Sequence, residues 1–304
     1  MPTLSPVRGR RAINYMVAGS LVAAGIIIIG ISRVEKWSWL CWVFLGVVIL
    51  DLRRDQLDIS LDKFLPTGLL MLLIPYAIYN YAPRFWEWVL GWQATTVDYV
   101  FRWNDLFRSI PYNDAAIFRI YQAPWLTYYM RWAYTYGFAL VVWVPVIRSF
   151  FARDGRKALR YILSSHSLQL PLIIIFYNTI LLEETWYVLG HPDGLARIIG
   201  PGDPMLWVRN AFPSMHTSVA FAVFLLSLRE KGRIFKWTMG VYSLSVIFST
   251  MYLEIHWILD VVGGIVLGWA AVKLCDYLMA LPWRAVPRAE FGAAHELSSS
   301  RPYR

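Results

Sequence analysis

Charge and cysteine are scarce in this 304-residue chain. Only 16% of its residues are charged, whereas 58% are hydrophobic, and this balance excludes an ordinary soluble globular domain. The two cysteines, Cys41 and Cys275, both lie inside apolar segments, where we expect them to serve as small hydrophobic side chains. They support neither a disulfide framework nor a zinc site. The chain also lacks an internal repeat, which a transporter built from inverted halves would show.

The chain is rich in long apolar segments. A helix needs about 20 largely apolar residues to cross the hydrocarbon of a bilayer. Six segments meet this requirement, and two shorter ones meet it if flanking aromatic residues extend them. We therefore predict an all-α, polytopic membrane helix bundle of about eight transmembrane helices: Ile13–Ile31, Trp37–Leu50, Leu65–Ala82, Thr127–Phe150, Leu168–Leu189, Ser214–Leu228, Phe235–Tyr252 and Leu259–Leu281.

We attribute the net charge of +9 to the membrane topology and not to a surface that binds nucleic acid. If the N-terminus is cytoplasmic, most of the 29 Lys and Arg residues fall in cytoplasmic loops or in the C-terminal tail, as the positive-inside rule requires. Both termini are then cytoplasmic. The loop Gly190–Pro213, His216 and His256 come to the same extracytoplasmic or lumenal face, which one shared active site requires. We expect membrane lipids as partners and no nucleic acid.

Four regions follow from this segmentation. Residues 1–64 form an N-terminal helical hairpin with a cytoplasmic loop, and residues 65–126 hold the third membrane helix with a Trp-rich interfacial segment. Residues 127–281 form the catalytic bundle, and residues 282–304 form a disordered cytoplasmic tail. Within the second region, Pro83–Pro124 is too polar to span the bilayer but rich in aromatic residues. We expect amphipathic helices there, as a lid or lipid portal or as a collar that packs the bundle.

Two short stretches carry the chemistry. Phe212-Pro213-Ser214-Met215-His216 reads as a helix start capped by Ser214, with His216 in the first turn, where N–H groups favour an anion. Ser249 to Asp260 places His256 four residues before Asp260, so both lie on one face of a helix. A carboxylate there can accept one imidazole N–H and leave the other nitrogen free to attack.

These residues support a two-step displacement at phosphorus. His256, oriented by Asp260, attacks and becomes a phosphohistidine, while His216 protonates the departing oxygen and then activates the incoming hydroxyl or water. The charge on the phosphoryl oxygens needs donors and cations, for which Ser214, Arg197 and Arg209 are candidates. No metal or other cofactor is expected.

The two stretches resemble the motifs of the type 2 phosphatidic acid phosphatase superfamily. Pro213-Ser214-Met215-His216 is similar to its Pro-Ser-Gly-His motif, and Ser249 to Asp260 has the spacing of its Ser-Arg-x5-His-x3-Asp motif. The resemblance covers roughly Thr127–Leu281. It implies that His256 is the nucleophile, Asp260 its partner, His216 the general acid and base, and Ser214 a phosphate binder.

The chain departs from the superfamily pattern in two places. Thr250 stands where the motif has arginine, and the first motif, a lysine followed by Arg-Pro, has no convincing match. Both departures, together with Gly194-Leu195-Ala196-Arg197, are similar to the branch that contains the fungal inositol phosphorylceramide synthases. That branch moves a phospho-headgroup to a lipid hydroxyl rather than to water. Arg197 is then the best substitute for the missing cation.

Other polar residues have less specific interpretations. Glu183 and Glu184, near the outer end of the fifth predicted helix, and Glu254, inside the second motif, could bind the hydroxyls of an acceptor; solvated or capping roles are the alternative. His166 and His191 match no motif, and we expect them at the membrane interface.

Three other classes of function stay open at this point. A lipid phosphate phosphatase would use the same residues with water as the acceptor. A zinc-dependent intramembrane hydrolase would need three ligands, for which only His216, His256 and Asp260 are at hand. A transporter or binding protein for a lipid phosphate would hold the phosphate without reacting.

Overall fold

The protein is a bundle of helices with one small parallel pairing of strands. The computed structural model describes residues 39–48, 50–200, 202–203 and 205–281. In chain order these residues form α2 (Trp39–Val48), the 3-10 helix η1 (Leu52–Arg54), α3 (Leu61–Thr96), β1 (Phe101–Arg102), α4 (Asn104–Ser109), the 3-10 helix η2 (Ala116–Arg119), α5 (Pro124–Phe151), α6 (Gly155–Ile162), the π-helical turn η3 (Leu163–Ser167), α7 (Leu170–Thr179), β2 (Ile180–Leu181), α8 (Thr185–Leu189), the 3-10 helix η4 (Leu206–Arg209), α9 (Met215–Ser227), α10 (Arg233–Tyr252) and α11 (Ile258–Ala280).

Four helices in the described part of the chain are long and apolar enough to cross a membrane. They are Asp62–Thr96, Pro124–Phe151, Gly155–Thr179 and Ile258–Ala280, while Met215–Ser227 is a shorter apolar helix. The prediction of a helical membrane protein is thereby supported, whereas the count of about eight spans is not confirmed. The predicted span Ile13–Ile31 lies outside the described residues.

The predicted fifth helix is displaced along the chain. It was expected at Leu168–Leu189, but the observed helix runs from Gly155 through the π-helical turn to Thr179. It begins early because the Asp154 side chain accepts the N–H of Lys157 and caps it. It ends early because Ile180 is extended and β2 pairs with β1. Glu183 and Glu184 therefore lie in a loop beyond the strand and not on a helix.

The third predicted helix is longer than expected. Helix α3 continues past Ala82 to Thr96 and takes in the first part of the segment that was expected to be interfacial. Three prolines, Pro66, Pro75 and Pro83, lie inside it. A proline removes one helical hydrogen bond but is tolerated in membrane helices, whose neighbours satisfy the freed groups. The helix therefore continues through the polar residues after Pro83, where the sequence predicted its end.

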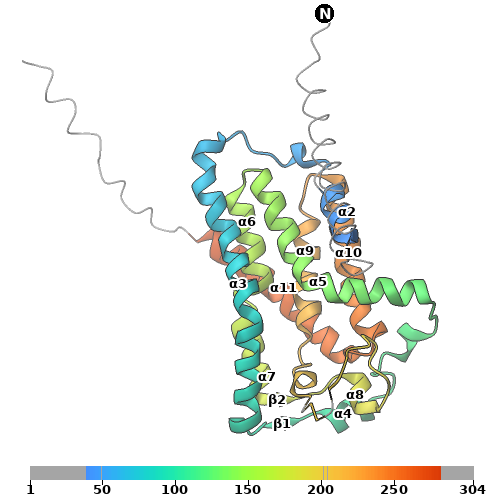
Figure 1. Cartoon of the computed structure of the whole chain (residues 1–304). Helices are drawn as coiled ribbons and strands as arrows, with labels where there is room; N and C mark the ends of the chain where they lie inside the picture. Colours follow the sequence, from blue (N-terminus) through green and yellow to red (C-terminus); the bar gives the residue numbers. More distant parts are fainter. Residues whose placement is uncertain (1–38, 49, 201, 204, 282–304) are drawn as a thin grey trace, which may run out of the picture.

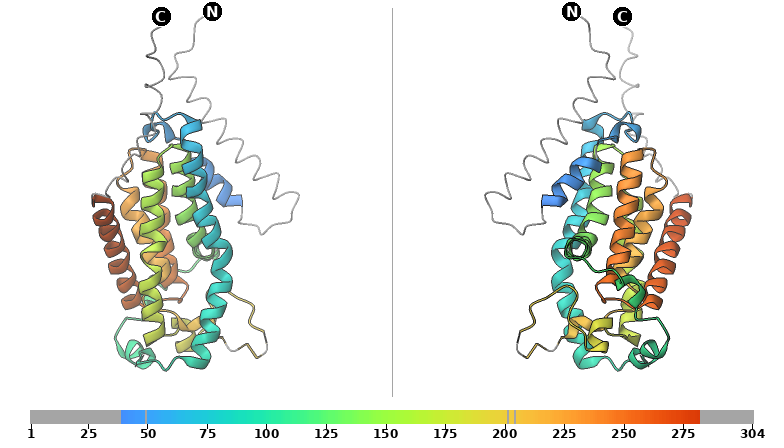
Figure 2. Two further views of the ribbon diagram at one scale, coloured as in Figure 1. Left: turned by 90° about the vertical axis from the view of Figure 1, so that its left-hand side faces the viewer. Right: turned by 90° about the vertical axis from the view of Figure 1, so that its right-hand side faces the viewer.

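The bundle has one elongated direction and two distinct ends. Figure 1 shows α3 running along its height, with β1, β2, α4 and α8 gathered at the end opposite to the chain between α2 and α3. The first part of α5 lies across this direction, as both Figure 1 and Figure 2 show. Helix α9 packs mainly against α10 and α11. Its inward residues are small and fully buried, among them Val219, Ala220 and Ala222.

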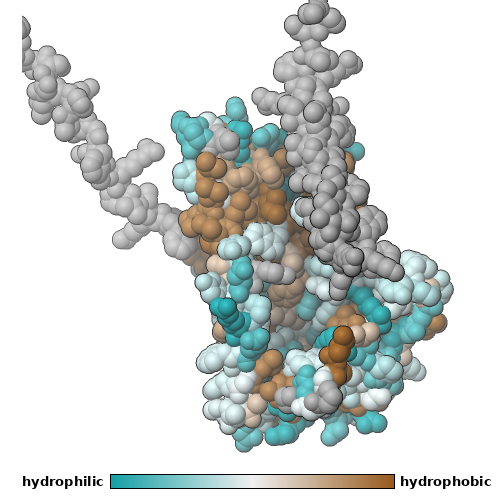
Figure 3. Space-filling view, in the orientation of Figure 1, coloured by the Kyte–Doolittle hydropathy of each residue, from teal (hydrophilic) through white to brown (hydrophobic). Residues whose placement is uncertain are grey.

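The outer face of the bundle is apolar. Figure 3 shows hydrophobic side chains covering the upper helices below a hydrophilic cap, with a mixed surface toward the other end. The exposed apolar residues on the long helices include Leu69, Leu70 and Leu73 of α3 and Val262 and Val266 of α11. Apolar surface of this extent is unusual in soluble monomers and is what a lipid environment requires.

A buried ionic cluster closes the end of the bundle opposite to the strands. Arg148 of α5, 1% exposed, pairs with Asp51 (3.1 Å) and with Asp55. Lys157 of α6 bonds Asp55 at 3.5 Å and Glu230, which follows α9, at 2.7 Å. The cluster therefore ties the segment around η1 to three helices. Burial alone would raise the pKa of the Asp55 carboxyl, but the hydrogen bond and charge of Arg148 hold it below its ordinary value.

Replacing Arg148 by methionine is expected to destabilise the protein strongly. The change would leave the buried Asp55 carboxylate without its main partner, a loss of about 3–5 kcal/mol by comparison with other broken buried pairs. Arg229→Met is the matched control, because its pair with Asp276 (2.8 Å) is partly exposed and should be worth about 0–1 kcal/mol. Thermal unfolding in detergent checks both variants. Equal small shifts would show that the buried cluster does not hold the fold.

Candidate active site

The centre of the site is a buried histidine–carboxylate pair. His256 lies in the turn between α10 and α11, and Asp260 lies in the first turn of α11. Nδ1 of His256 is 3.2 Å from Oδ2 of Asp260. The imidazole is 4% exposed and the carboxylate fully buried. The two side chains meet as predicted, but His256 precedes α11 and does not share a helix face with Asp260. Nε2 is the imidazole nitrogen that does not contact the carboxylate.

The backbone around the pair is fixed from two sides. Oδ2 of Asp260 also accepts the N–H of Trp257 at 3.0 Å, so the carboxylate caps its own helix. Asn113, which precedes η2, accepts the N–H of Ile258 at its carbonyl and that of Leu259 at Oδ1. The first N–H groups of α11 are therefore satisfied by a loop residue that nothing in the sequence indicated.

Helix α9 begins at the same place. Ser214 is its N-cap, as predicted, and its Oγ accepts the N–H of Thr217 at 3.3 Å and donates to Oγ1 of Thr217 at 2.9 Å. The N–H of Ser214 donates to the carbonyl of Asp260 at 3.1 Å. The two sequence motifs, more than thirty residues apart, are thus joined by one backbone hydrogen bond. The Ser214 side chain is fully buried in this arrangement.

His216 lies in the first turn of α9 and is held between aromatic rings. Its imidazole stacks on Tyr134 of α5, with ring centres 4.2 Å apart and planes 19° apart. Phe138, one turn further along α5, meets it edge-on at 5.0 Å. Nothing in the two motifs indicated these neighbours, because they come from a helix that precedes both motifs by many residues.

One cavity joins the two histidines. It has a volume of about 740 Å³, and His216, His256, Glu184 and Asn210 contribute its polar wall. Apolar and aromatic side chains make up the rest: Ile78, Tyr81, Ala82, Pro83, Phe85, Trp86, Leu90, Tyr134, Phe138, Leu170, Tyr177, Trp207 and Met215, together with His166. A large, mainly apolar cavity with a few convergent polar groups is typical of a ligand site. The second half of α3 forms one whole side of it.

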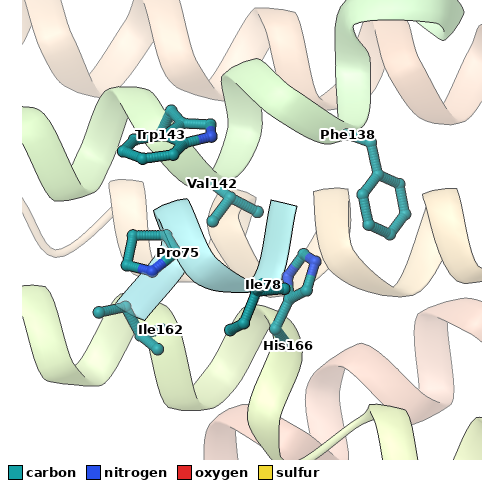
Figure 4. Close-up of a pocket in the computed structure, with 7 residues that line it drawn as sticks. All are labelled: Pro75, Ile78, Phe138, Val142, Trp143, Ile162 and His166. Atoms are coloured by element: carbon teal, nitrogen blue, oxygen red, sulfur yellow. The ribbon is translucent and has the colours of Figure 1, made fainter. Parts of the chain in front are cut away.

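His166 is not at the membrane interface as expected. It lies in the π-helical turn η3, is 9% exposed, and lines both the large cavity and a small space of about 10 Å³ that Figure 4 shows. Its ring meets Phe138 edge-on at 5.1 Å. The sequence did contain an indication that His166 belongs to a functional site. A histidine inside an apolar run costs free energy in a membrane unless its side chain has a partner or a function.

Arg197 is the cation best placed at the cavity. It donates to Asp193 (2.7 Å from Nε) and to Glu184 (2.5 Å and 3.2 Å), and its guanidinium lies 4.1 Å from the ring centre of Trp207. Burial works against its charged form, yet the hydrogen bonds to Asp193 and Glu184 raise its pKa further above its ordinary value. Glu184 and Trp207 both line the cavity, so Arg197 stands directly behind its wall.

The other predicted ligands lie elsewhere. Glu183 accepts a hydrogen bond from Asn104 (2.8 Å) and is 4.0 Å from Arg209, and neither Glu183 nor Arg209 lines the cavity. Glu254 has a left-handed backbone and pairs with Arg119 (2.9 Å) and His191 (2.6 Å), again outside the cavity wall. Of the three glutamates proposed to meet an acceptor, only Glu184 faces the cavity.

Thr250 stands where the superfamily motif has arginine. Thr250 is fully buried, and its hydroxyl donates to the carbonyl of Ile247 at 2.7 Å, so it does not take the place of the missing arginine.

Among the described residues there is no group of three or more His, Cys, Asp or Glu side chains arranged to hold a metal ion.

The fold and the site together describe a helical membrane protein with a histidine–carboxylate pair and a second histidine at one cavity of about 740 Å³. The family model of the PAP2 superfamily matches residues 181–283, about a third of the chain, and this stretch contains Arg197, Ser214, His216, His256 and Asp260. Members of that superfamily are generally phosphatases and phosphotransferases, and the match fits a lipid phosphatase or phosphotransferase. No curated protein and no solved structure matches the chain.

The close approach of α9 and α11 gives a testable prediction for Gly264. A Cβ there would lie 2.6 Å from the carbonyl oxygen of Ser214 and 2.9 Å from Cβ of Thr217. Gly264→Ala should therefore separate the two helices and cost about 1–3 kcal/mol of stability. Gly91→Ala is the control, because nothing lies within 4 Å of that position in α3 and it should be neutral or gain about 0.5–1 kcal/mol. Melting temperatures in detergent that are alike for the two variants would contradict the close packing.

Proposed function

We propose that this protein is an integral-membrane lipid phosphotransferase that works through a phosphohistidine on His256. The observation that carries the proposal is the pairing of His256 with Asp260 at 3.2 Å beside His216 in the wall of one large cavity. The match to the PAP2 superfamily supports the same class of reaction. Membrane lipids are the proposed partners.

In the first step, Nε2 of His256 attacks the phosphorus of the donor lipid. Asp260 accepts a hydrogen bond from the N–H at Nδ1 and so keeps the attacking nitrogen, Nε2, unprotonated. The carboxylate also stabilises the positive ring that forms. The bond between phosphorus and the lipid oxygen breaks, and His216, acting as an acid, gives that oxygen a proton. The donor leaves as a lipid alcohol and the phospho-headgroup stays on His256.

In the second step, a hydroxyl of an acceptor lipid attacks the same phosphorus. His216, now unprotonated, takes the proton of that hydroxyl while the bond between phosphorus and Nε2 breaks. The product is the acceptor lipid carrying the phospho-headgroup, and both histidines return to their starting state. Water in place of the acceptor gives hydrolysis by the same route, so the cavity wall decides between transfer and hydrolysis by admitting or excluding water.

Arg197 is the proposed cation for the phosphoryl oxygens. Its present partners are Glu184 and Asp193, and its guanidinium has five N–H groups in a fork that suits phosphate. We propose that a bound phosphate competes for the N–H groups that now face Glu184. The N–H groups at the start of α9, capped by Ser214, are a second proposed source of donors. Arg209 is the weaker candidate, because its nearest carboxylate, Glu183, is outside the cavity wall.

Glu184 then has a role as the acceptor of headgroup hydroxyls. Its carboxylate is 7% exposed, faces the cavity and is released from Arg197 when phosphate binds there. A polyol headgroup such as inositol phosphate, as the resemblance to inositol phosphorylceramide synthases implies, would offer hydroxyl donors to it. This reaction would take place at the extracytoplasmic or lumenal face.

The reaction can be followed with purified protein in nanodiscs. Phosphatidic acid, an undecaprenyl-type phosphate and phosphatidylinositol would be supplied in turn, with and without a ceramide or diacylglycerol acceptor. We expect phosphatidylinositol to yield a headgroup-bearing acceptor lipid. His256→Ala should abolish turnover, by about 10³-fold or more, and Asp260→Asn should lower it by about 10²- to 10⁴-fold, because an amide stabilises the wrong imidazole tautomer.

The same assay separates the alternatives. Free phosphate released from phosphatidic acid without an acceptor, and lost in His256→Ala, would make the protein a phosphatase. Turnover that survives His256→Ala would rule out the phosphohistidine mechanism. Binding of lipid phosphate with no turnover in the wild-type protein would support a transport or binding role. A labelled donor should also leave an adduct on the wild-type protein that is stable in base and labile in acid.

The two arginines make a matched pair of variants. Arg197→Met should lower kcat/KM by about 10²-fold, because a charged donor is lost where the phosphoryl oxygens develop charge. Arg209→Met should lower it by less than about threefold, because the half-buried Arg209 contacts Glu183 at 4.0 Å outside the cavity wall. Steady-state kinetics with the best donor lipid checks both. The opposite order would assign the missing cation to Arg209.

A further inference from the structure

A third histidine lies deep in the cavity and takes no part in the proposed chemistry. His166 is in the π-helical turn η3, near the middle of the membrane-length segment Gly155–Thr179. Single π-helical turns inside helices occur frequently at functional sites, because they rotate side chains out of the regular helical positions. Here the imidazole lies in the cavity wall and meets Phe138 of α5 edge-on.

The position of His166 relative to His216 is fixed by one aromatic ring. The ring centre of Phe138 is 5.1 Å from that of His166 and 5.0 Å from that of His216, so the two imidazole centres are at most about 10 Å apart. Gln169, three residues after His166, donates to the carbonyl of Ser218 at 3.3 Å, which is inward from the start of α9. His166 is therefore deeper in the membrane-length part of the bundle than the reacting histidines.

One ring nitrogen of His166, Nδ1, has no hydrogen-bond partner among the described residues. The residue is 9% exposed. Figure 4 shows the imidazole beside Ile78 of α3, with Phe138 and Trp143 of α5 among the mainly apolar side chains around that small space. A buried polar atom with no partner is costly, and an ionisable side chain within a membrane-length helix indicates a functional role.

We propose that His166 donates a hydrogen bond to an uncharged carbonyl of the lipid substrate, an ester or an amide at the base of its acyl chains. In a glycerolipid or a sphingolipid such a carbonyl is a few covalent bonds from the phosphorus or from the reacting hydroxyl, which agrees with the short distance between His166 and His216. The inference rests on the proposed function and adds a substrate class to it: lipids with an acyl carbonyl, in preference to polyprenyl phosphates, which have only hydrocarbon at this depth.

The test compares two phosphatidylinositols of equal chain length, one with ester-linked and one with ether-linked chains, in the transfer assay described above. They differ in the carbonyl groups alone. The wild-type protein should favour the ester lipid about tenfold in kcat/KM. His166→Phe keeps a flat ring against Phe138 but removes the donor, so the preference should fall to about one, while His166→Gln should keep most of it.

Ile78→Ala is the control for a change of cavity shape, since Ile78 lines both spaces but is apolar. It should alter the rates for the two lipids by the same factor. A merely structural role for His166 would do likewise, so an equal loss for both lipids in His166→Phe would overturn the proposal. No ester preference in the wild-type protein would overturn it as well.

A binding measurement keeps this inference separate from the reaction. The same two lipids would be added to the His256→Ala protein, and to the same protein carrying His166→Phe, and the melting temperatures compared. Greater stabilisation by the ester lipid that disappears with His166→Phe would support the carbonyl site even if no turnover were found. Equal stabilisation by both lipids would overturn it, even if the phosphotransferase activity were established.

Discussion

The arrangement of the site depends on the contact between the start of α9 and the start of α11. The N–H of Ser214 donates to the carbonyl of Asp260, and Gly264, one turn further along α11, leaves room for the α9 backbone. Small residues let two membrane helices approach closely enough for such contacts. Because His216 and Asp260 are in the first turns of these two helices, this packing sets the geometry on which catalysis would depend.

The polar groups buried in the bundle lie mainly in two places. At one end, Arg148 and Asp55 form a cluster of paired charges with their partners. At the other, the pair of His256 and Asp260 lies beside the cavity. Buried atoms without a hydrogen bond among the described residues occur in both places, as Nε of Arg148 and as Oδ1 of Asp260 and Nδ1 of His166. What distinguishes the second place is therefore the cavity beside it, into which a ligand can enter.

The superfamily match and the cavity describe different parts of the same site. The match covers residues 181–283 and contains the histidines, the aspartate and Arg197. The opposite side of the cavity is built by α3 and α5, through residues such as Trp86, Tyr134 and Phe138, which lie before the matched stretch. The cavity wall is therefore shared between the matched stretch and helices that precede it.

The sequence alone determined the apolar helical character and the N-cap at Ser214, because each is a local property of spacing or composition. It also predicted that His256 and Asp260 meet, although they do so across the turn that precedes α11 and not on one helix face. It misplaced the helix bearing His166 and the end of α3, since an apolar run does not show where a strand pairing or a capping side chain will end a helix. Only the tertiary structure decided that Glu184 faces the cavity while Glu183 and Glu254 do not, and that His166 joins the site. Adjacent residues in a loop point in different directions, and side chains from distant helices meet only when the bundle has packed.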